Sequence, residues 1–154
     1  MPVRPLSVRP LSVRPFRESD RTAVLALWAA CGLTRPWNPP AGDLDRALGN
    51  PSSTVLVAED RGGIMGSVMV GDDGHRGWVY YLSVQPGSQK AGLGRDLMTA
   101  AEDWLRARGV RKIELMVRNT NDAVIGFYES IGYGQEPVTV LSRWLIDDPT
   151  REAT

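Results

Sequence analysis

The feature that most constrains the fold is the stretch from Val84 to Arg95, which holds three glycines between two segments of different character. The segment before it, residues 78–84, is rich in β-branched and aromatic residues, as strands are. The segment after it repeats apolar residues at helical spacing, which predicts an amphipathic helix. This order favours an anion site, because the first helical amides lack intrahelical partners and the helix dipole attracts negative charge. The same glycines are also typical of an ordinary turn, so the stretch alone leaves both interpretations open.

Length and composition narrow the class of protein. A chain of 154 residues is large enough for one domain with its own core. Its formal net charge is zero, which gives no electrostatic reason for a nucleic-acid partner. With Cys31 and His75 as its one cysteine and one histidine, an internal disulfide is excluded and a metal site is not expected. No apolar run approaches the roughly 20 residues that span a bilayer, and no secretion signal is evident, so we expect a cytoplasmic protein without a membrane partner.

The N-terminus repeats a five-residue unit. Val-Arg-Pro-Leu-Ser occurs at 3–7 and 8–12, and a third copy begins as Val13-Arg14-Pro15-Phe16. Because proline donates no amide to a ladder, we take only the third copy as a strand and predict that residues 1–12 form a mobile tail. A docking segment is the alternative. The predicted domain then covers residues 13–146, followed by a polar tail at 147–154.

The rest of the chain alternates strand and helix patterns. Hairpin-linked strands come first and crossover helices later, which predicts an α/β (mixed α+β) fold with one mixed sheet and helices on both faces. Ser19 or Asp20 is a candidate cap for the first helix, and glycines follow the predicted helix ends. The expected strands cover residues 13–16, 54–59, 64–71, 78–84, 112–117 and 138–146. The expected helices cover residues 20–31, 43–48, 93–108 and 122–131.

Two motifs occur in order on these elements. The first is Val84-x-Pro86 followed by Gln89-Lys90-Ala91-Gly92-Leu93-Gly94, at the start of the long helix. The second is Asn121-x-Ala123-x-x-x-Phe127-Tyr128-x-x-x-Gly132-Tyr133, on the last helix. Together they resemble the two signatures of the GNAT acyl-CoA N-acyltransferases, and the resemblance covers roughly Val13 to Ile146. Residues 35–38 and 73–77 further resemble a YpeA-like branch of small bacterial GNAT proteins.

The resemblance implies a fold and an activity. GNAT domains have a mostly antiparallel central sheet of six to seven strands, splayed at the fourth and fifth, with about four flanking helices. The implied function is transfer of an acetyl group from acetyl-CoA to a primary amine, made directly in a ternary complex and without a metal. The acceptor, a small-molecule or peptide amine, is left open. The alternative is a non-catalytic acyl-CoA-binding or regulatory module of the same fold.

The resemblance also assigns residues to the donor. Backbone amides from about Lys90 to Arg95 would bind the CoA pyrophosphate, and strand residues 80–84 would pair with the pantetheine amides. Ala91 stands where family members often carry Arg or Gln, so we expect weaker CoA affinity. Asn121 contacts CoA, caps its helix, or does both. The expected CoA-binding residues are Leu82, Val84, Gln89, Lys90, Ala91, Gly92, Leu93, Gly94, Arg95, Asn121, Phe127 and Tyr128.

Tyr128 is the predicted general acid, because a nearby phenol can protonate the departing CoA thiolate. Helical spacing alone would make it a core aromatic residue, and the paired motifs favour the catalytic role. Glu114 or His75 is a candidate base, although a strand Glu and a turn His are both also typical of solvated surface residues. Met116 stands where ribosomal-protein N-terminal acetyltransferases carry a Glu, which counts against that subclass.

The acceptor site is the least specified part. GNAT acceptor specificity is commonly set between the first two helices, so Arg35 and Trp37 are candidates. Trp37 could equally plug its loop against the core. The expected acceptor-site residues are Arg35, Trp37, His75, Tyr80 and Tyr81.

The C-terminal part of the domain is short for this family. After Gly132 only one strand pattern remains, whereas many GNAT domains have two. An open sheet edge tends to be covered or paired. We therefore predict a homodimer formed near Val138 to Ile146.

Overall fold

A five-stranded sheet forms the framework of the fold. In the computed structural model, which describes residues 12–88 and 92–150, the strands lie in the order β1-β2-β3-β4-β5. The pairs β1–β2, β2–β3 and β3–β4 are antiparallel, whereas β5 runs parallel to β4, so the sheet is mixed as predicted. The proposed tail, except for Ser12, lies outside the described residues. The strands are β1 Ser12–Pro15, β2 Ser53–Asp60, β3 Gly63–Asp72, β4 Gly77–Val84 and β5 Ile113–Leu115.

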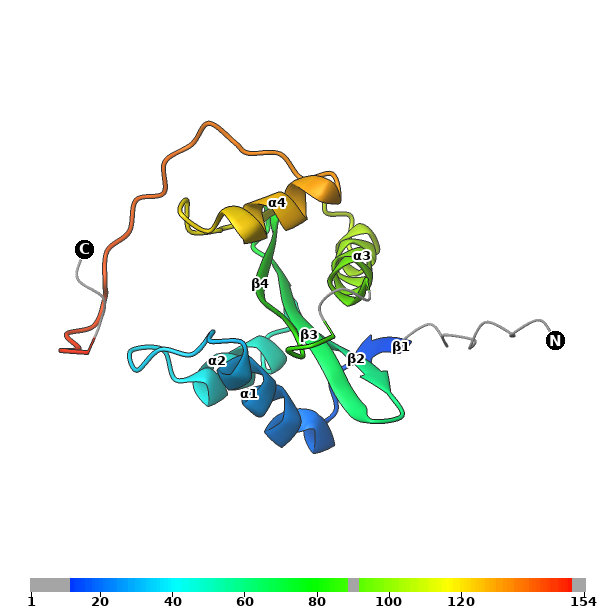
Figure 1. The fold of residues 1–154 in the computed structure, drawn as a ribbon. Helices are drawn as coiled ribbons and strands as arrows, with labels where there is room; N and C mark the ends of the chain where they lie inside the picture. The colour runs from blue at the N-terminus through cyan, green and yellow to red at the C-terminus, as the bar shows by residue number, and fades with distance from the viewer. Residues whose placement is uncertain (1–11, 89–91, 151–154) are drawn as a thin grey trace.

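Helices cover both faces of this sheet (Figure 1). Helices α1 and α2 lie on one face, whereas α3 lies on the other with α4 beside it. Among the described residues, no helix is both long and apolar enough to cross a membrane. The helices are α1 Arg21–Ala30, α2 Pro40–Leu48, α3 Leu93–Arg106 and α4 Asp122–Ser130, and a short 3-10 helix, η1 Glu18–Asp20, precedes α1.

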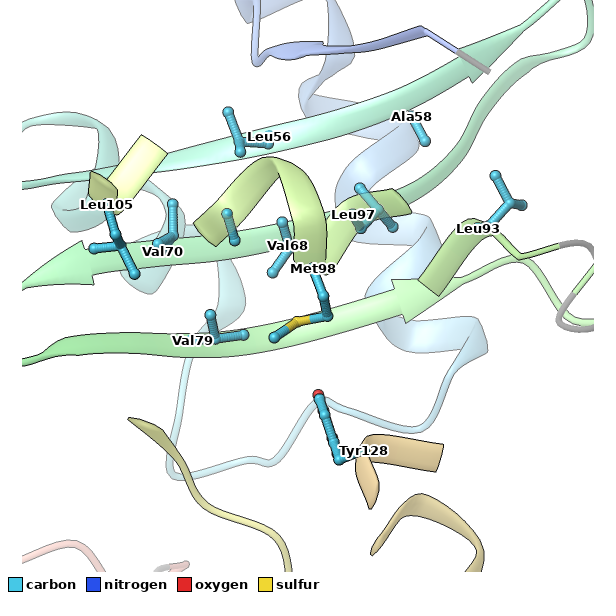
Figure 2. Close-up of a cluster of buried hydrophobic side chains, with 11 residues drawn as sticks. Leu56, Ala58, Val68, Val70, Val79, Leu93, Leu97, Met98, Leu105 and Tyr128 are labelled. Carbon is cyan, nitrogen blue, oxygen red and sulfur yellow. The ribbon is translucent and has the colours of Figure 1, made fainter. Parts of the chain in front are cut away.

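Strand alternation divides the core into two clusters. On β2, Val55 and Val57 belong to the cluster under α1 and α2, whereas Leu56 and Ala58 belong to the cluster under α3. The two sets separate because successive side chains of a strand point to opposite faces. Figure 2 shows the cluster under α3, which also includes Tyr128 of α4. The long amphipathic helix is therefore fixed over the sheet by its apolar face, as its periodicity predicted.

The prediction of six to seven strands is wrong, because the sheet has five. Strand β5 is shorter than the expected segment 112–117, and residues 138–146 form no strand. Beyond α4 the chain runs away from the sheet (Figure 1), and Leu141 and Leu145 are about nine-tenths exposed, at 90% and 92%. High β-propensity does not make a strand without a neighbouring strand to share hydrogen bonds.

Strand β4 has a partner on its β5 side over only part of its length. Gly77, Trp78 and Val79 pair with β5. From Tyr80 to Val84, no strand of the described structure pairs with that side. This loss of pairing is what a splay between the fourth and fifth strands requires.

An ion pair ties β1 to the start of α1. The guanidinium of Arg14 donates to both carboxylate oxygens of Asp20, at 2.8 and 3.0 Å, and to Glu59 of β2 at 2.7 Å. Asp20 also accepts a hydrogen bond from the amide of Arg17 at 2.7 Å, so its carboxylate does not cap α1 as expected. The bond from Arg14 holds the pKa of Asp20 below its usual value. The third copy of the N-terminal repeat is thereby anchored to the domain.

Replacing Asp20 with Asn should lower the free energy of unfolding by about 2–4 kcal/mol, because it removes one carboxylate from the mostly buried Arg14 charge. A lowered folded-state pKa stabilises the protein above the unfolded pKa of about 4, and this contribution is lost as the pH falls through the folded-state pKa. In urea unfolding, the difference between wild type and D20N should therefore be largest near neutral pH and shrink below about pH 4.

Glu18→Gln is the matched control, because Glu18 pairs with Arg21 while 73% exposed. It should change the free energy of unfolding by less than about 0.5 kcal/mol. Equal effects of D20N and E18Q would contradict the anchoring role of the Arg14–Asp20 pair.

Candidate active site

The site is organised around an irregularity in β4. Ser67 pairs with Ser83 while Met69 pairs with Tyr80, so β4 holds one residue more than β3 over this interval. Such a bulge bends a strand and redirects its side chains. Tyr81 lies within the bulge at a φ of 54°, a left-handed conformation that bulky residues rarely adopt. The backbone of β4 is therefore strained where the strand turns.

Contacts on two helices hold Tyr81 in this conformation. Its ring stacks on Trp28 of α1 with centroids 4.1 Å apart, and its hydroxyl donates to Oδ2 of Asp43 on α2 at 2.6 Å. Trp28 in turn donates from Nε1 to the hydroxyl of Ser67 at 3.0 Å, which lies 2.8 Å from that of Ser83. Burial and the bond to Asp43 raise the pKa of Tyr81, so its hydroxyl stays protonated. These contacts offset a backbone strain of about 1–3 kcal/mol.

The last residues of β4 are fixed by their side chains although one backbone edge has no strand partner. Leu82 and Val84 are half-buried and pack against the cluster under α3. The carbonyl oxygen of Val84 accepts a hydrogen bond from the Cys31 thiol at 3.2 Å. Cys31, directly after α1, and the side chains of α3 thus hold an edge that can pair with an extended ligand.

Helix α3 begins where the chain returns from β4. Gly92 precedes the helix with a φ of 77°, which glycine adopts without strain. In the first turn Leu93 is buried and Arg95 is exposed. An α-helix leaves its first amides without intrahelical partners, and here they belong to the turn that follows Gly92. Three predicted CoA-binding residues lie outside the described residues: Gln89, Lys90 and Ala91.

Gly94 is explained by a contact with α4. A Cβ added at Gly94 would lie 2.9 Å from Cζ of Phe127, closer than side chains can approach. The Phe127 ring is therefore seated on the first turn of α3, and it meets the Tyr128 ring edge-on at 5.0 Å. The absence of a side chain at Gly94 thus sets where Tyr128 lies relative to the start of α3.

Tyr128 directs its hydroxyl toward β4 (Figure 2). The residue is 8% exposed, and its ring also contacts Tyr133 at 5.6 Å. Burial raises the pKa of Tyr128 to about 12, so the phenol holds its proton at neutral pH and can donate it. At the start of α4, Asn121 accepts a hydrogen bond from the amide of Val124 at 3.3 Å, which confirms its predicted role as a cap.

A cavity of about 840 Å³ opens between the α1–α2 loop, α2 and β4, and we call it the acceptor cavity. Four of the five predicted acceptor residues line it: Arg35, Trp37, Tyr80 and Tyr81. The loop and the bulged strand, far apart in the sequence, therefore form one concave surface.

A second cavity of about 1400 Å³ lies between β5, α4 and the residues that follow α4. Tyr128 lines this cavity. Met116 and Arg118, which follow β5, line both cavities. The two cavities therefore adjoin just beyond the point where β5 stops pairing with β4.

The two candidate bases lie apart from the acceptor cavity. Glu114 faces two cations, Arg76 at 3.6 Å and Lys112 at 3.8 Å. His75 is exposed on the β3–β4 turn, where its amide donates to Asp73 at 2.9 Å, and it does not line the acceptor cavity. Within residues 12–88 and 92–150, no three His, Cys, Asp or Glu side chains are grouped to hold a metal ion. The base assignments stay predictions.

Two charged residues of α2, Asp43 and Arg46, line the acceptor cavity but were not among the predicted site residues. Residues three apart share one face of a helix, so their spacing could have paired them. The prediction began this helix at Asp43, whereas it begins at Pro40, where proline needs no amide partner. The spacing of residues in the sequence does not reveal which face of α2 borders the cavity, because that depends on how the helix packs against the sheet.

Replacing Gly94 with Ala should lower the free energy of unfolding by about 1–2 kcal/mol, because the new methyl group overlaps the Phe127 ring. In a Phe127→Leu background the same change should cost little, since the ring is gone and alanine favours the helix. Urea unfolding of the four proteins gives the coupling free energy. An equal cost of G94A in both backgrounds would show that the ring does not confine this position.

Known proteins give an independent classification. Residues 16–133 match the model of the acetyltransferase (GNAT) family. An acetyltransferase of Pectobacterium atrosepticum is 48% identical over 133 residues, which cover 86% of this chain and 94% of that protein. One of Yersinia enterocolitica is 46% identical with the same coverage. In fold, the chain is similar to the aminoglycoside N-acetyltransferase AAC(6')-Iy solved in complex with CoA, at a TM-score of 0.78 and 14% identity, covering 92% of this chain and 100% of that one. The predicted family is confirmed: the chain belongs to the acetyltransferase (GNAT) family and is an acetyltransferase enzyme.

Proposed function

We propose that this enzyme moves the acetyl group of acetyl-CoA directly to a primary amine in a ternary complex. The observation that carries the proposal is that the start of α3 and the hydroxyl of Tyr128 both lie at β4, whose edge is open beyond Val79. A donor along that edge would have a helix start for its phosphates and a phenol for its sulfur.

Acetyl-CoA is the proposed donor. Its pyrophosphate would accept hydrogen bonds from the first amides of α3, where the helix dipole also favours negative charge. Its pantetheine amides can pair with β4 from Tyr80 to Val84, because no described strand occupies that edge. The enzyme of similar fold that was solved with CoA fits this choice of cosubstrate. The further proposed contacts are Leu82, Gln89, Lys90, Ala91, Arg95, Asn121 and Phe127.

The transfer requires two proton movements. The neutral amine nitrogen attacks the thioester carbon, and the carbon–sulfur bond then breaks so that sulfur leaves with the bonding electrons. Tyr128 would give its proton to that sulfur, and the proton lost by the amine restores the phenol through solvent. Glu114 and His75 remain the proposed bases for the incoming ammonium. Glu114 lies in an ion-paired cluster, and His75 lies on an exposed turn. These positions support a catalytic role less strongly than the buried position of Tyr128 beside β4 does.

The proposed acceptor is a small-molecule amine in the acceptor cavity. Trp37 and Tyr80 offer it aromatic surface, and Arg35 and Tyr81 offer polar groups. Solved enzymes of this fold act on aminoglycosides, which are small-molecule amines. A non-catalytic acyl-CoA-binding module is not favoured, since the acceptor cavity adjoins the cavity that Tyr128 lines.

Replacing Tyr128 with Phe should lower kcat at least about 100-fold with little change in the Kd for acetyl-CoA, because the ring stays and the proton donor is lost. Because the pKa of Tyr128 is raised to about 12, its loss of a proton should not slow the wild-type enzyme between about pH 7 and 10. Release of the CoA thiol with a panel of amines gives kcat, and titration calorimetry gives the Kd.

Tyr133→Phe is the matched control. It also removes a hydroxyl beside the Tyr128 ring, one that donates to Glu102 at 2.6 Å. The rate of Y133F should stay within about threefold of wild type. A Y128F rate within the same range would contradict the general-acid role.

We also propose that two copies of the enzyme pair through the segment from Val138 to Ile146. Most of its apolar side chains are exposed, and β5 has an open edge within the described sheet. An exposed apolar segment and an open edge in the same chain can complete each other between two copies. Equilibrium sedimentation at high micromolar concentration should give twice the chain mass, and Leu145→Asp should halve it. A wild-type monomer at that concentration would refute the dimer.

A further inference from the structure

The acceptor cavity is lined by more positive than negative side chains. Arg35, Arg46 and Arg118 contribute guanidinium groups, whereas Asp43 is the one carboxylate among its described lining residues. That carboxylate already accepts the short hydrogen bond from Tyr81. The chain as a whole has no net charge, so the positive excess belongs to this cavity and not to the protein in general.

Two of these arginines keep their charge available to a ligand. Arg35 donates from Nη1 to the carbonyl oxygens of Gly32 and Thr34, both at 2.8 Å, and these neutral acceptors orient the guanidinium without cancelling its charge. The guanidinium of Arg46 makes no hydrogen bond or ion pair with another described residue. The adjacent carboxylate on α2, Asp45, pairs with Arg21 of α1 at 2.7 Å. Arg21 of α1 and Arg106 of α3 are paired with carboxylates in this way, whereas Arg46 is not.

We propose that the acceptor is a small primary amine that also carries a carboxylate or phosphate group, and that Arg35 and Arg46 bind this anionic group. The inference rests on the transfer function proposed above and specifies its substrate class. Guanidinium groups bind both anions through charge-assisted, often bidentate, hydrogen bonds. A cleft lined mainly by one sign of charge also concentrates ligands of the opposite sign and repels polycations.

Matched pairs of amines test the charge preference. β-Alanine is compared with β-alaninamide, and O-phosphoethanolamine with ethanolamine, while spermidine represents polycations. At least one anionic amine should be acetylated with a kcat/KM at least about tenfold above that of its neutral partner, the effect of one charge-assisted hydrogen bond. The two pairs also distinguish carboxylate from phosphate recognition. Neutral amines or spermidine that match or exceed both anionic amines would overturn the proposal.

Variants locate the preference. Arg46→Gln should raise KM for the preferred anionic amine at least about tenfold and leave KM for its neutral partner within about twofold, and Arg46→Lys should restore part of the difference. Arg61→Gln is the matched control, because Arg61 is an exposed arginine of the β2–β3 turn that does not line the cavity. R61Q should change neither the KM for the anionic amine nor the KM for its neutral partner. An equal effect of R46Q on both amines would indicate a structural defect and contradict the proposal.

A binding assay without turnover separates this inference from the transfer reaction. N-acetyl-β-alanine and N-acetyl-β-alaninamide, with the corresponding N-acetyl pair from O-phosphoethanolamine and ethanolamine, are titrated calorimetrically into enzyme saturated with CoA. At least one acid should bind wild type about tenfold more tightly than its neutral partner does. In R46Q, which keeps Arg35, this preference should be reduced severalfold. If this preference is found but no amine is acetylated, the transfer function fails and the anion site stands. If amines are acetylated but no preference for anionic ligands is found, the transfer function stands and the anion site fails.

Discussion

Strand β4 loses its partner β5 after Val79, and the remaining parts of the site depend on that separation. Continued pairing would close the edge from Tyr80 to Val84 with strand hydrogen bonds and leave no backbone for a ligand. The bulge at Tyr81 bends β4 at the same point, and the stack on Trp28 holds the strained residue there. One face of the sheet thus carries α1 and α2 beside the acceptor cavity, while the other carries α3 and α4, whose helix start and phenol form the proposed donor site.

The two glycines at the start of α3 meet two separate physical requirements. Gly92 supplies a left-handed backbone conformation that starts the helix. Gly94 supplies space for Phe127, and the helix that carries Phe127 also carries Tyr128. The loop interpretation and the anion-site interpretation are therefore compatible. The same residues that make the turn also bring the phenol of a later helix to the helix start that would bind phosphate.

Sequence periodicity predicted most of the framework and little of the acceptor site. The strands β2 to β4 are rich in β-branched and aromatic residues or bounded by turn residues, and α3 and α4 carry helical patterns, so their positions were predictable. The strand expected at 138–146 is absent, because a pattern records how well residues suit a sheet and not whether a neighbouring strand is available. Asp43 and Arg46 were missed for a related reason: their place on the cavity wall depends on how α2 packs against the face of the sheet that carries the Tyr81 side chain.

A crystal structure with bound acetyl-CoA tests the central claim most directly. The pyrophosphate oxygens should lie within hydrogen-bond distance of the first amides of α3, and the thioester sulfur should lie about 3–4 Å from the Tyr128 hydroxyl, with the acetyl group directed toward Tyr80 and Tyr81. A pyrophosphate bound away from the start of α3, or a sulfur more than about 5 Å from that hydroxyl without a bridging water, would contradict the assignment of β4, α3 and Tyr128 as the donor site.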